Sequence, residues 1–468
     1  MRRLQQEVTK IGQGRRMIPE EDLDKMQYLK AVIKESLRLH PSLSLLPRES
    51  TQDVKLMGYD ISSGTQRNIG RPERFLNKFN DYKAHTFEWI PFGAGRRGCP
   101  GIQFSVVVLE LALANIVYKF DLALPNGVHC EDLDMTEKFG ITLHRNSSLM
   151  YKHTQHLADF LTRNIMTIFS SFQTFLPLLF SFIVLMIFIR TTWSSFNSKT
   201  KKNFPPSPRK LPIIGNFHQL GLSPNHSLRT LSQKHGPVML LHFGSVPTLV
   251  ASSAEVAREI MKTHDLSFCS RPNLSIPNIL LYGSKDIVFS PYGEYWRQLK
   301  SIVMVHLLNN TQVKSFRQVR EEEISSMMAM LGETSGSLVN MGSSLTSLTN
   351  NIICRVTVGR TYDGKLTDLW TRFANMFTVL SVGNYIPWLS WIDWLSGLEG
   401  RAKKLAKEVD TFLESVIEEN INKKSEMGVD LRNHEGQNLV EIMLNVQRDN
   451  TSGFTLQRDT LKCVILTK

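Results

Sequence analysis

The stretch FGAGRRGCPG, from Phe92 to Gly101, decides how the rest of the chain is interpreted. It surrounds one cysteine, Cys99, with glycines and with the two arginines Arg96 and Arg97. Cysteine binds metals as the thiolate, and neighbouring cations favour the thiolate over the thiol. The glycines allow tight turns and a close approach to a flat group that larger residues would obstruct. Cys99 is therefore a candidate metal ligand.

Two alternatives to metal binding stay open at this point. The letters GAGRRG, residues 93–98, also satisfy the G-x-G-x-x-G fingerprint of dinucleotide-binding proteins, with Asp121 at a suitable distance downstream. Against this fingerprint, Pro91 and Pro100 crowd the strand-to-helix turn that it requires, and no clear alternation of strands and helices surrounds it. Cys99 could instead be a buried structural cysteine, because free cysteine is among the most buried residue types. The adjacent arginines and glycines argue against that alternative.

The aromatic, glycine, arginine and cysteine residues of the stretch have the spacing of a known motif: Phe92, Gly95, Arg97, Cys99 and Gly101. It closely resembles the haem-binding loop of the cytochrome P-450 superfamily, in which a cysteine thiolate binds the iron and favours cleavage of the O–O bond. The resemblance implies that Cys99 is the axial iron ligand and that Arg97 contacts a haem propionate. It also places Phe92, Gly93 and Gly101 in the cofactor-binding loop. The implied cofactor is haem b, iron protoporphyrin IX.

Length and composition bound the class of protein. The 468 residues can form one large domain or about two to four ordinary ones, and a hydrophobic content of 42% is enough for a buried core. The five cysteines are scattered without CxxC spacing, so neither a disulfide framework nor a zinc site is indicated. The net charge of +12 comes from dispersed Lys and Arg without a nucleic-acid-binding motif. It favours a membrane surface or an acidic protein partner over nucleic acid.

Hydrophobic periodicity predicts several helices and one hairpin. After the cysteine loop, the run GIQFSVVVLELALANIVY is apolar almost all round, which is typical of a buried helix. Residues 237–253, PVMLLHFGSVPTLVASS, predict a β-hairpin that turns near Gly244. Two sets with helical spacing predict faces that pack in the core: Ile324, Met327, Met328 and Leu331, and Leu405, Val409, Phe412, Leu413 and Val416.

A second resemblance to the superfamily concerns structural charges. The segment KESLRLHP, residues 34–41, resembles the E-x-x-R helix of the family, and PERF, residues 72–75, resembles its partner segment. The resemblance implies a buried, structural charge cluster of Glu35, Arg38 and Arg74 that braces the haem loop. The alternative is an ordinary solvated pair, since Glu35 and Arg38 lie three residues apart on one helix face. Between residues 66 and 72 the chain lacks a strand-and-helix segment that the family has.

Two further segments resemble haem-contacting parts of the family. LLPREST, residues 45–51, matches a strand, and the resemblance implies that Arg48 is a second contact of the propionates. FSPYGEYWRQLKSI, residues 289–302, matches a helix, and the resemblance implies the same role for Trp296 and Arg297. The alternative for this pair is a surface aromatic residue beside a solvated cation. Beyond the haem ligand, the sequence indicates no catalytic residue.

Residues 165–189 predict a membrane anchor. They include FLPLLFSFIVLMIFI, which is long and apolar enough to cross a bilayer, although a buried core helix is the alternative. Lys and Arg follow directly, so the positive-inside rule places the downstream part in the cytosol. The next stretch, NFPPSPRKLPIIGN at 203–216, resembles the proline-rich hinge behind the family's amino-terminal anchor. These features imply a single-pass protein of the endoplasmic reticulum membrane.

The resemblance covers nearly the whole chain, in two blocks whose order is reversed relative to the family. This order suggests a fusion of two neighbouring genes, and the chain ends before the distal helix that carries the oxygen-activating acid and threonine. The expected fold is mainly α with a smaller β part, cytochrome P-450-like but incomplete and non-collinear. The expected layout is a back-half block with the cysteine loop at 1–153, a linker at 154–164, a transmembrane anchor at 165–189, a basic and proline-rich hinge at 190–216, and a front-half block at 217–468.

The resemblance implies a haem-thiolate monooxygenase of the plant microsomal type. Such an oxidoreductase inserts one oxygen atom of O2 into a small hydrophobic substrate, here one of secondary metabolism, with electrons from an NADPH-linked flavoprotein reductase. The main alternative is a membrane-bound remnant without catalysis. A spanning anchor would place Cys99 in the lumen and both Trp296 and Arg297 in the cytosol, where one cavity could not use all three. A dinucleotide-dependent oxidoreductase built on residues 93–98 is the weaker alternative.

Overall fold

The computed structural model describes parts of both blocks. The described residues are 1–43, 45, 47–69, 87, 89–122, 124, 132–138, 144–145, 147, 150–151, 202–221, 223–334, 337–362, 364–427, 437–449 and 456–466. Arg74 and the expected anchor at 165–189 lie outside these residues, so both remain predictions.

The first block is organised around helix α3 (Ile102–Lys119), which begins directly after the cysteine loop. Most residues from Glu110 to Val117 are buried, which confirms the buried helix expected from the apolar sequence. The other elements of this block are α1 (Arg2–Gly12), η1 (Glu20–Lys25), α2 (Gln27–Leu39), η2 (Gly95–Arg97), β1 (Arg48–Glu49), β2 (Val54–Leu56), β3 (Tyr59–Ile61), β4 (Gln66–Ile69), β5 (Glu137–Lys138), β6 (His144–Arg145) and β7 (Met150–Tyr151).

The second block is mainly helical. Its long helices are α11 (Arg317–Glu333), α12 (Met341–Val358) and α15 (Leu398–Met427). The faces expected to pack in the core do so, since Ile324, Met328, Leu413 and Val416 are at most 1% exposed. The other elements are η5 (Phe217–Gln219), α5 (Pro224–His235), β8 (Val238–Phe243), β9 (Val246–Ala251), α6 (Ala254–Arg258), η6 (Glu259–Thr263), α7 (Asp265–Phe268), α8 (Ser275–Leu280), α9 (Glu294–Ile302), η7 (Val303–Leu307), α10 (Asn310–Ser315), β10 (Val339–Asn340), α13 (Gly364–Met376), η8 (Val382–Asn384), η9 (Pro387–Leu389), α14 (Ser390–Leu395), α16 (Leu439–Asp449) and α17 (Arg458–Leu466).

One four-stranded sheet joins the two blocks. Its strand order is β1-β4-β9-β8, so two strands come from each block. The joint is a parallel pairing of β4 with β9, in which Gln66 is opposite Thr248 and Ile69 is opposite Ala251. The hairpin β8–β9 turns at Gly244, as the sequence predicts, and Gly244 has a φ of 59° that favours glycine.

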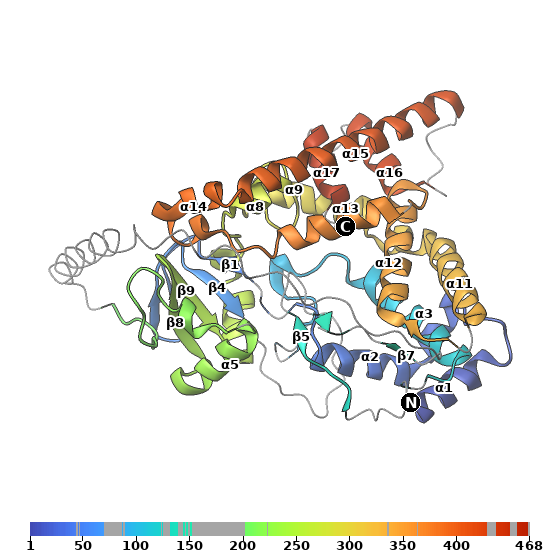
Figure 1. Cartoon of the computed structure of the whole chain (residues 1–468), viewed down its shortest axis with the longest axis horizontal. Coiled ribbons are helices and arrows are strands. Elements are labelled where there is room, and N and C mark those ends of the chain that lie inside the picture. Colours follow the sequence, from blue (N-terminus) through green and yellow to red (C-terminus); the bar gives the residue numbers. More distant parts are fainter. Residues whose placement is uncertain are drawn as a thin grey trace, which may run out of the picture.

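The helices of both blocks share one hydrophobic core. It contains Leu111 of α3, Ile324 of α11 and Leu413 of α15, none of which is exposed to solvent. Figure 1 shows the sheet at the left end of the molecule with α5 and α14 near it, and helices of both blocks, among them α1, α3, α11 and α12, gathered at the other end. The prediction of a mainly helical fold with a smaller β part is therefore confirmed.

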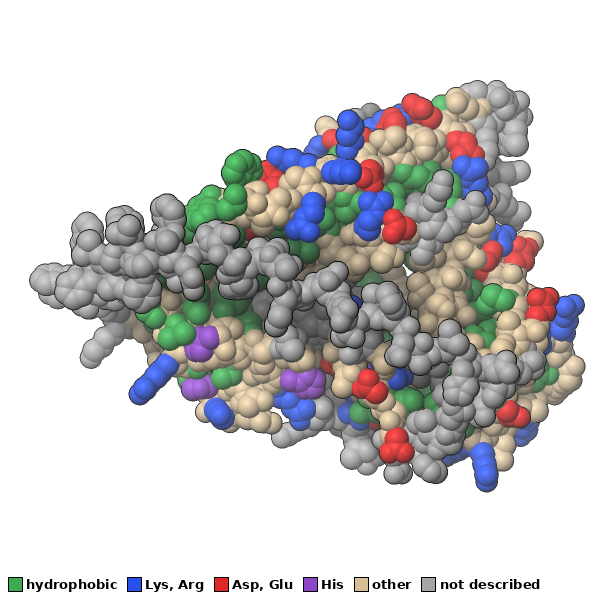
Figure 2. Space-filling model, in the orientation of Figure 1, with side chains coloured by type: hydrophobic (Ala, Val, Ile, Leu, Met, Phe, Trp, Pro, Cys, Tyr) green, Lys and Arg blue, Asp and Glu red, His purple; other side chains and the backbone are tan. Residues whose placement is uncertain are grey.

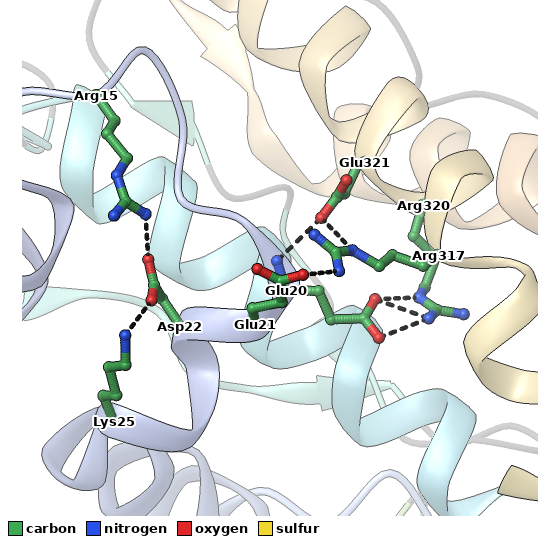
Figure 3. Close-up of polar contacts among 8 residues, drawn as sticks. All are labelled: Arg15, Glu20, Glu21, Asp22, Lys25, Arg317, Arg320 and Glu321. Carbon is green, nitrogen blue, oxygen red and sulfur yellow. Dashed lines mark hydrogen bonds and ion pairs between the residues drawn. The ribbon is translucent and has the colours of Figure 1, made fainter.

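A buried ion pair also joins the blocks. Glu20 of η1 and Arg320 of α11 form a bidentate pair in which Nε and Nη2 donate to the two carboxylate oxygens, both at 2.8 Å (Figure 3). The Arg320 side chain is 0% exposed, and its Nη1 donates to Val313 O at 2.8 Å. At the rim, Arg317 contacts Glu21 at 2.5 Å and Glu321 at 2.9 Å. No motif in the sequence predicts this cluster.

Candidate cofactor site

A cavity of about 430 Å³ lies where the cysteine loop of the first block faces helices of the second. Most of its wall is apolar, and its polar part consists mainly of cations and the cysteine. The residues that line the cavity include Leu37, Arg48, Phe92, Gly93, Arg97, Cys99, Gly101, Phe104, Arg271, Ile287, Val288, Trp296, Lys300, Val303, Leu307, Val356, Leu439 and Val464. A volume of this size is typical of small-molecule and cofactor sites.

Glycines and one backbone hydrogen bond shape the cysteine loop. Gly93 and Gly95 have φ values of 72° and 67°, a region that favours glycine. A Cβ on Gly95 would lie 2.4 Å from Met261 O, so this glycine is needed where the loop packs against η6. The N–H of Cys99 donates to Phe92 O at 2.9 Å and closes the loop.

Cys99 is exposed and lines the cavity. Burial of the loop nevertheless raises the pKa of its thiol, while the N–H of Gly101, which donates to the sulfur, lowers it. The guanidinium groups of Arg96 and Arg97, which the sequence led us to expect beside the thiolate, contact other acceptors. Arg96 lies 3.3 Å from Asp265 Oδ2, and Arg97 donates to backbone carbonyls of the second block.

Arg97 connects the cysteine loop to the second block. Its Nε donates to Cys269 O at 2.7 Å, its Nη2 to Ser290 O at 2.5 Å and its Nη1 to Ile287 O at 3.3 Å. The guanidinium carbon lies 4.2 Å from the ring centroid of Trp296, in cation–π geometry. Burial lowers the pKa of Arg97 to about 10, which leaves it charged at neutral pH. Arg97 and Trp296, both expected from the resemblance, therefore meet at one cavity.

Arg48, also expected from the resemblance, lines the same cavity and is 2% exposed. Its Nη2 donates to Ala94 O at 2.7 Å, and its Nη1 lies 3.3 Å from Asp265 Oδ1. The other oxygen of Asp265 accepts the N–H of Arg96 at 3.1 Å. Burial lowers the pKa of Arg48, and the nearby Asp265 carboxylate partly offsets this effect.

Arg271 and Lys300 are two further cations that line the cavity, and the sequence did not predict either of them. Arg271 donates from Nε to Val288 O at 2.9 Å and from Nη1 to Pro47 O. Burial lowers its pKa to about 9, and repulsion from Arg48 and Arg97 contributes. Lys300 donates to Arg96 O and lies 5.1 Å from the ring centroid of Trp296. Its spacing of one helical turn after Trp296 could have revealed it, whereas no local pattern distinguishes Arg271.

Arg297 does not belong to this group, contrary to the expectation. It is exposed, is not among the residues that line the cavity, and lies over the ring of Tyr292 with its guanidinium carbon 5.7 Å from the centroid. The reason is helical geometry, because the residue after Trp296 is rotated by about 100° around α9. Lys300, one turn further, returns to the cavity face.

The expected charge cluster of Glu35, Arg38 and Arg74 is not buried at Glu35. Arg38 donates from Nε and Nη2 to the two oxygens of Glu35, at 2.8 and 2.6 Å. The Glu35 side chain is 50% exposed and that of Arg38 18% exposed, so the pair is open to solvent on the Glu35 side. Arg74 lies outside the described residues. The contribution of this helix to the cavity is apolar, through Leu37.

The dinucleotide alternative does not match the geometry of residues 93–98. Among the described residues this segment forms a turn and the short 3-10 helix η2, and α3 begins only at Ile102. The fingerprint requires a parallel strand directly before the glycines and a helix that begins on them. Asp121, expected to bind the ribose, is exposed and accepts a hydrogen bond from Gln5 at 2.9 Å.

The donor set of the cavity fits haem. Four cations, Arg48, Arg97, Arg271 and Lys300, face a mostly apolar space. Burial lowers the pKa values of Arg97, Arg271 and Lys300, and repulsion between the cations lowers them further. A ligand with acid groups would relieve this repulsion. An apolar ring would fill the remaining space, and Cys99 offers sulfur to a metal at its centre. The cavity thus has the kinds of residue that a flat, acid-bearing metal cofactor would need.

The chain belongs to the cytochrome P450 family, because the family model "Cytochrome P450" matches residues 1–69, 71–151 and 205–467. Cytochrome P450 Tp4149 of Tanacetum parthenium is 59% identical over 296 residues, covering 63% of this chain and 58% of that protein. Cytochrome P450 71A4 of Solanum melongena is 49% identical over 293 residues, covering 61% and 57%. Norfluorocurarine oxidase of a Strychnos species is 45% identical over 303 residues, covering 62% and 59%.

The chain therefore spans less than two thirds of the length of these relatives. A zebra fish cytochrome P450 structure with progesterone aligns at 22% identity and a TM-score of 0.44, over 53% of this chain and 56% of that one. The reversed order of the blocks and the fusion of two genes are not supported by these comparisons. The family and its plant relatives agree with the superfamily that the cysteine loop resembles.

The structure also bears on the expected separation of the two blocks. Cys99 and Trp296 line one cavity, an arrangement that a membrane-spanning anchor between them would not allow. Among the residues that the structure describes, one helix, α3, is long and apolar enough to cross a membrane. Because 44% of that stretch is buried inside the protein, this helix is weak evidence for a membrane span.

Proposed function

We propose that this chain is a haem-thiolate monooxygenase that acts on a small hydrophobic substrate with electrons from an NADPH-linked flavoprotein reductase. One observation carries the proposal. Cys99 lines the same cavity as Arg48, Arg97, Arg271 and Lys300, although Arg97 and its acceptor Ser290 are 193 residues apart in the sequence. An arrangement of one sulfur and several cations around an apolar space suits an iron porphyrin with two acid groups.

The roles of the chain's own residues follow from this arrangement. Cys99 would hold the iron through Sγ, and the N–H of Gly101 would stabilise the thiolate by donating to it. The arginines and Lys300 would hold the propionates, with Trp296 packed against Arg97. Haem, when bound, supplies the activation of O2 for insertion of one oxygen atom. Val303, Leu307 and Val356 line the cavity as an apolar wall that would exclude water and accept a hydrophobic substrate.

The absorption spectrum of the purified chain with added hemin tests the proposal. After reduction and addition of carbon monoxide, we expect a thiolate-type Soret band in the wild type and none in Cys99→Ser. Cys354→Ser is the matched control, because Cys354 lies half-buried on α12 and does not line the cavity. No thiolate band in the wild type would contradict the proposal and favour the catalytically inactive remnant.

The relatives suggest the kind of reaction. One is called norfluorocurarine oxidase, and another, from Tanacetum parthenium, is called 3-beta-hydroxylase and is 48% identical over 299 residues. Both names support oxidation of a small organic molecule of plant secondary metabolism. Incubation of the haem-loaded chain with NADPH, a plant reductase and a panel of such molecules should give products that carry oxygen from O2. Reductase-dependent NADPH consumption without product would argue against a competent substrate site.

We also propose that the protein sits on the endoplasmic reticulum membrane through a continuous apolar face. The β8–β9 turn contacts two segments that carry exposed apolar side chains, residues 211–214 and residues 380–395. Gly244 N donates to Ile214 O at 3.2 Å, and Ser245 N donates to Tyr385 O at 2.8 Å. Hydrophobic side chains gather over α14 in Figure 2. The exposed members of the face are Leu211, Ile214, Leu380, Trp388, Trp391, Trp394 and Leu395, and Trp394 is 72% exposed. Tryptophan is enriched at membrane interfaces.

Quenching of tryptophan fluorescence by brominated lipid tests this face. In vesicles that contain brominated acyl chains, replacing Trp388, Trp391 and Trp394 by Ser should remove most of the quenchable emission of this face. Replacing Trp89, which is 7% exposed, by Phe should leave the quenched fraction unchanged. Equal quenching in the wild type and the triple variant would show that this face does not enter the lipid.

A further inference from the structure

A buried carboxylate lies directly behind the cavity wall. Asp286, in the loop between α8 and α9, is 0% exposed. Its Oδ2 accepts the backbone N–H groups of Val288 at 2.7 Å and of Phe289 at 3.0 Å. The carboxylate therefore fixes the conformation of residues 286–289 by two charge-assisted hydrogen bonds.

The carbonyls of this turn hold three side chains that line the cavity. Ile287 O accepts from Trp296 Nε1 at 2.9 Å and from Arg97 Nη1 at 3.3 Å. Val288 O accepts from Arg271 Nε at 2.9 Å. Arg97, Arg271 and Trp296 thus donate to two successive carbonyls. Arg97 donates in addition to Cys269 O at 2.7 Å and to Ser290 O at 2.5 Å.

We propose that Asp286 is a positioning residue for the acid-binding side of the cavity. By fixing the turn, it orients the carbonyls of Ile287 and Val288, and these orient Arg97, Arg271 and Trp296 toward the acid groups of the bound porphyrin. The porphyrin as ligand rests on the proposed function. The bracket, by which we mean the hydrogen bonds from the Asp286 carboxylate to the turn and from the turn to Arg97 and Arg271, rests on the contacts described above.

Asp286 could act through its hydrogen bonds to the turn or through its negative charge, and two substitutions distinguish these roles. Asp286 Oδ1 is buried and, within the described residues, has no hydrogen-bond partner. It lies in the field of Arg97 and Arg271, which it helps to keep charged. Asp286→Ala removes both the bracket and the charge. Asp286→Asn keeps one acceptor oxygen for the turn, removes the charge and puts an NH2 group in place of the second oxygen. It should therefore rescue binding if the two backbone hydrogen bonds are what matters.

Binding of metal-free protoporphyrin IX and of its dimethyl ester, measured by fluorescence titration of the full chain, tests the proposal. The free acid presents both acid groups but no iron, so it does not depend on ligation by Cys99. The ester has the same ring without the charges. The matched control is Asp393→Ala, because Asp393 also accepts two successive backbone N–H groups, from Val382 at 2.9 Å and Gly383 at 2.8 Å. The turn that Asp393 holds does not line this cavity, whereas Ile287 and Val288 do.

We expect Asp286→Ala to weaken binding of the free acid by about tenfold or more, the scale of a lost hydrogen bond to a charged group. Binding of the ester to Asp286→Ala should stay within about twofold of the wild-type value, because the ester carries no acid groups. Asp286→Asn and Asp393→Ala should bind the free acid within about twofold of the wild type, because each keeps the hydrogen bonds that fix the turn at 286–289. Equal weakening for acid and ester, a failure of Asp286→Asn to rescue, or a wild type that does not prefer the acid would each overturn the proposal. A chain that prefers the acid in this way but gives no thiolate band with hemin would refute the proposed function and leave the role of Asp286 intact.

Discussion

Two carboxylate–guanidinium pairs in this chain have the same bidentate geometry but different surroundings. Glu20 and Arg320 are 300 residues apart in the sequence, and the Arg320 side chain is 0% exposed. Glu35 and Arg38 are three residues apart on α2, and the Glu35 side chain is 50% exposed. The first pair joins the two blocks of the fold, whereas the second connects two residues of the same helix.

The comparison teaches that geometry alone does not set the contribution of an ion pair. When one member of a buried pair is removed, the other remains as an uncompensated charge in a medium that solvates it poorly. When one member of an exposed pair is removed, water replaces it. We therefore expect the Glu35–Arg38 pair, which resembles a family motif, to contribute less to the free energy of unfolding than the Glu20–Arg320 pair, which no motif predicts.

The largest effect is expected for Arg320→Ala. It leaves the Glu20 carboxylate, 15% exposed, without a partner and removes the donor to Val313 O. The free energy of unfolding should fall by about 3–5 kcal/mol, measured by urea denaturation followed by circular dichroism.

Arg317→Ala is the matched control, on the same helix and against the same segment. Arg317 is 35% exposed, so its removal should lower the free energy of unfolding by only about 0.2–1 kcal/mol. The double variant Glu20→Leu with Arg320→Met leaves no unpaired charge and should recover most of the stability lost in Arg320→Ala. Similar losses for Arg317→Ala and Arg320→Ala would contradict the importance of burial.

Glu110 shows what a buried carboxyl does without a guanidinium partner. It is 4% exposed on α3, and burial raises its pKa from 4.5 to about 7, while Lys30 and Lys34 only partly offset the rise. Between these two pH values the folded chain holds a proton that the unfolded chain has released, so stability should fall as the pH rises from about 4.5 to about 7.

Glu110→Gln should remove this slope, because the amide does not titrate. At pH 8 the variant should be more stable than the wild type, on the order of 1–2 kcal/mol after allowance for solvent screening. Urea denaturation at pH 5, 6, 7 and 8 measures the difference. A wild type whose stability does not change across this range would show that Glu110 is not protonated in the folded chain.

The sequence reveals much of this molecule where the signal is local. The cysteine loop, the hairpin at Gly244 and the core faces of α11 and α15 depend on neighbouring residues, and the structure has the hairpin and the core faces as expected. The loop's role at the iron stays a prediction. Arg271 could not be found, because only the folding of 269–288 against the loop brings it to the cavity. The resemblance of residues 289–302 to a family helix implied Arg297 together with Trp296, but in the structure Lys300, one helical turn after Trp296, lines the cavity instead.

Long-range features lie beyond such patterns for a physical reason. The partner of Arg320 is set by how η1 packs against α11, and no periodicity within either segment encodes that contact. Burial of Glu35 was inferred from the motif around it, but the exposure of a residue depends on what covers its helix. Local motifs therefore predict which groups interact more reliably than they predict how much the interaction contributes.

The smallest effect is expected for Glu35→Ala. The pKa of Glu35 is lowered chiefly by its hydrogen bonds with Arg38, so the pair does form, but solvent screens it. The free energy of unfolding should change by about 0.2–1 kcal/mol, and 1 M salt should remove most of that difference. Arg38→Ala with Glu35→Ala gives the coupling energy in a double-mutant cycle. A coupling as large as that of Glu20 with Arg320 would mean that Glu35 is covered in the folded protein, as the family motif implies, and that the contrast between the two pairs is false.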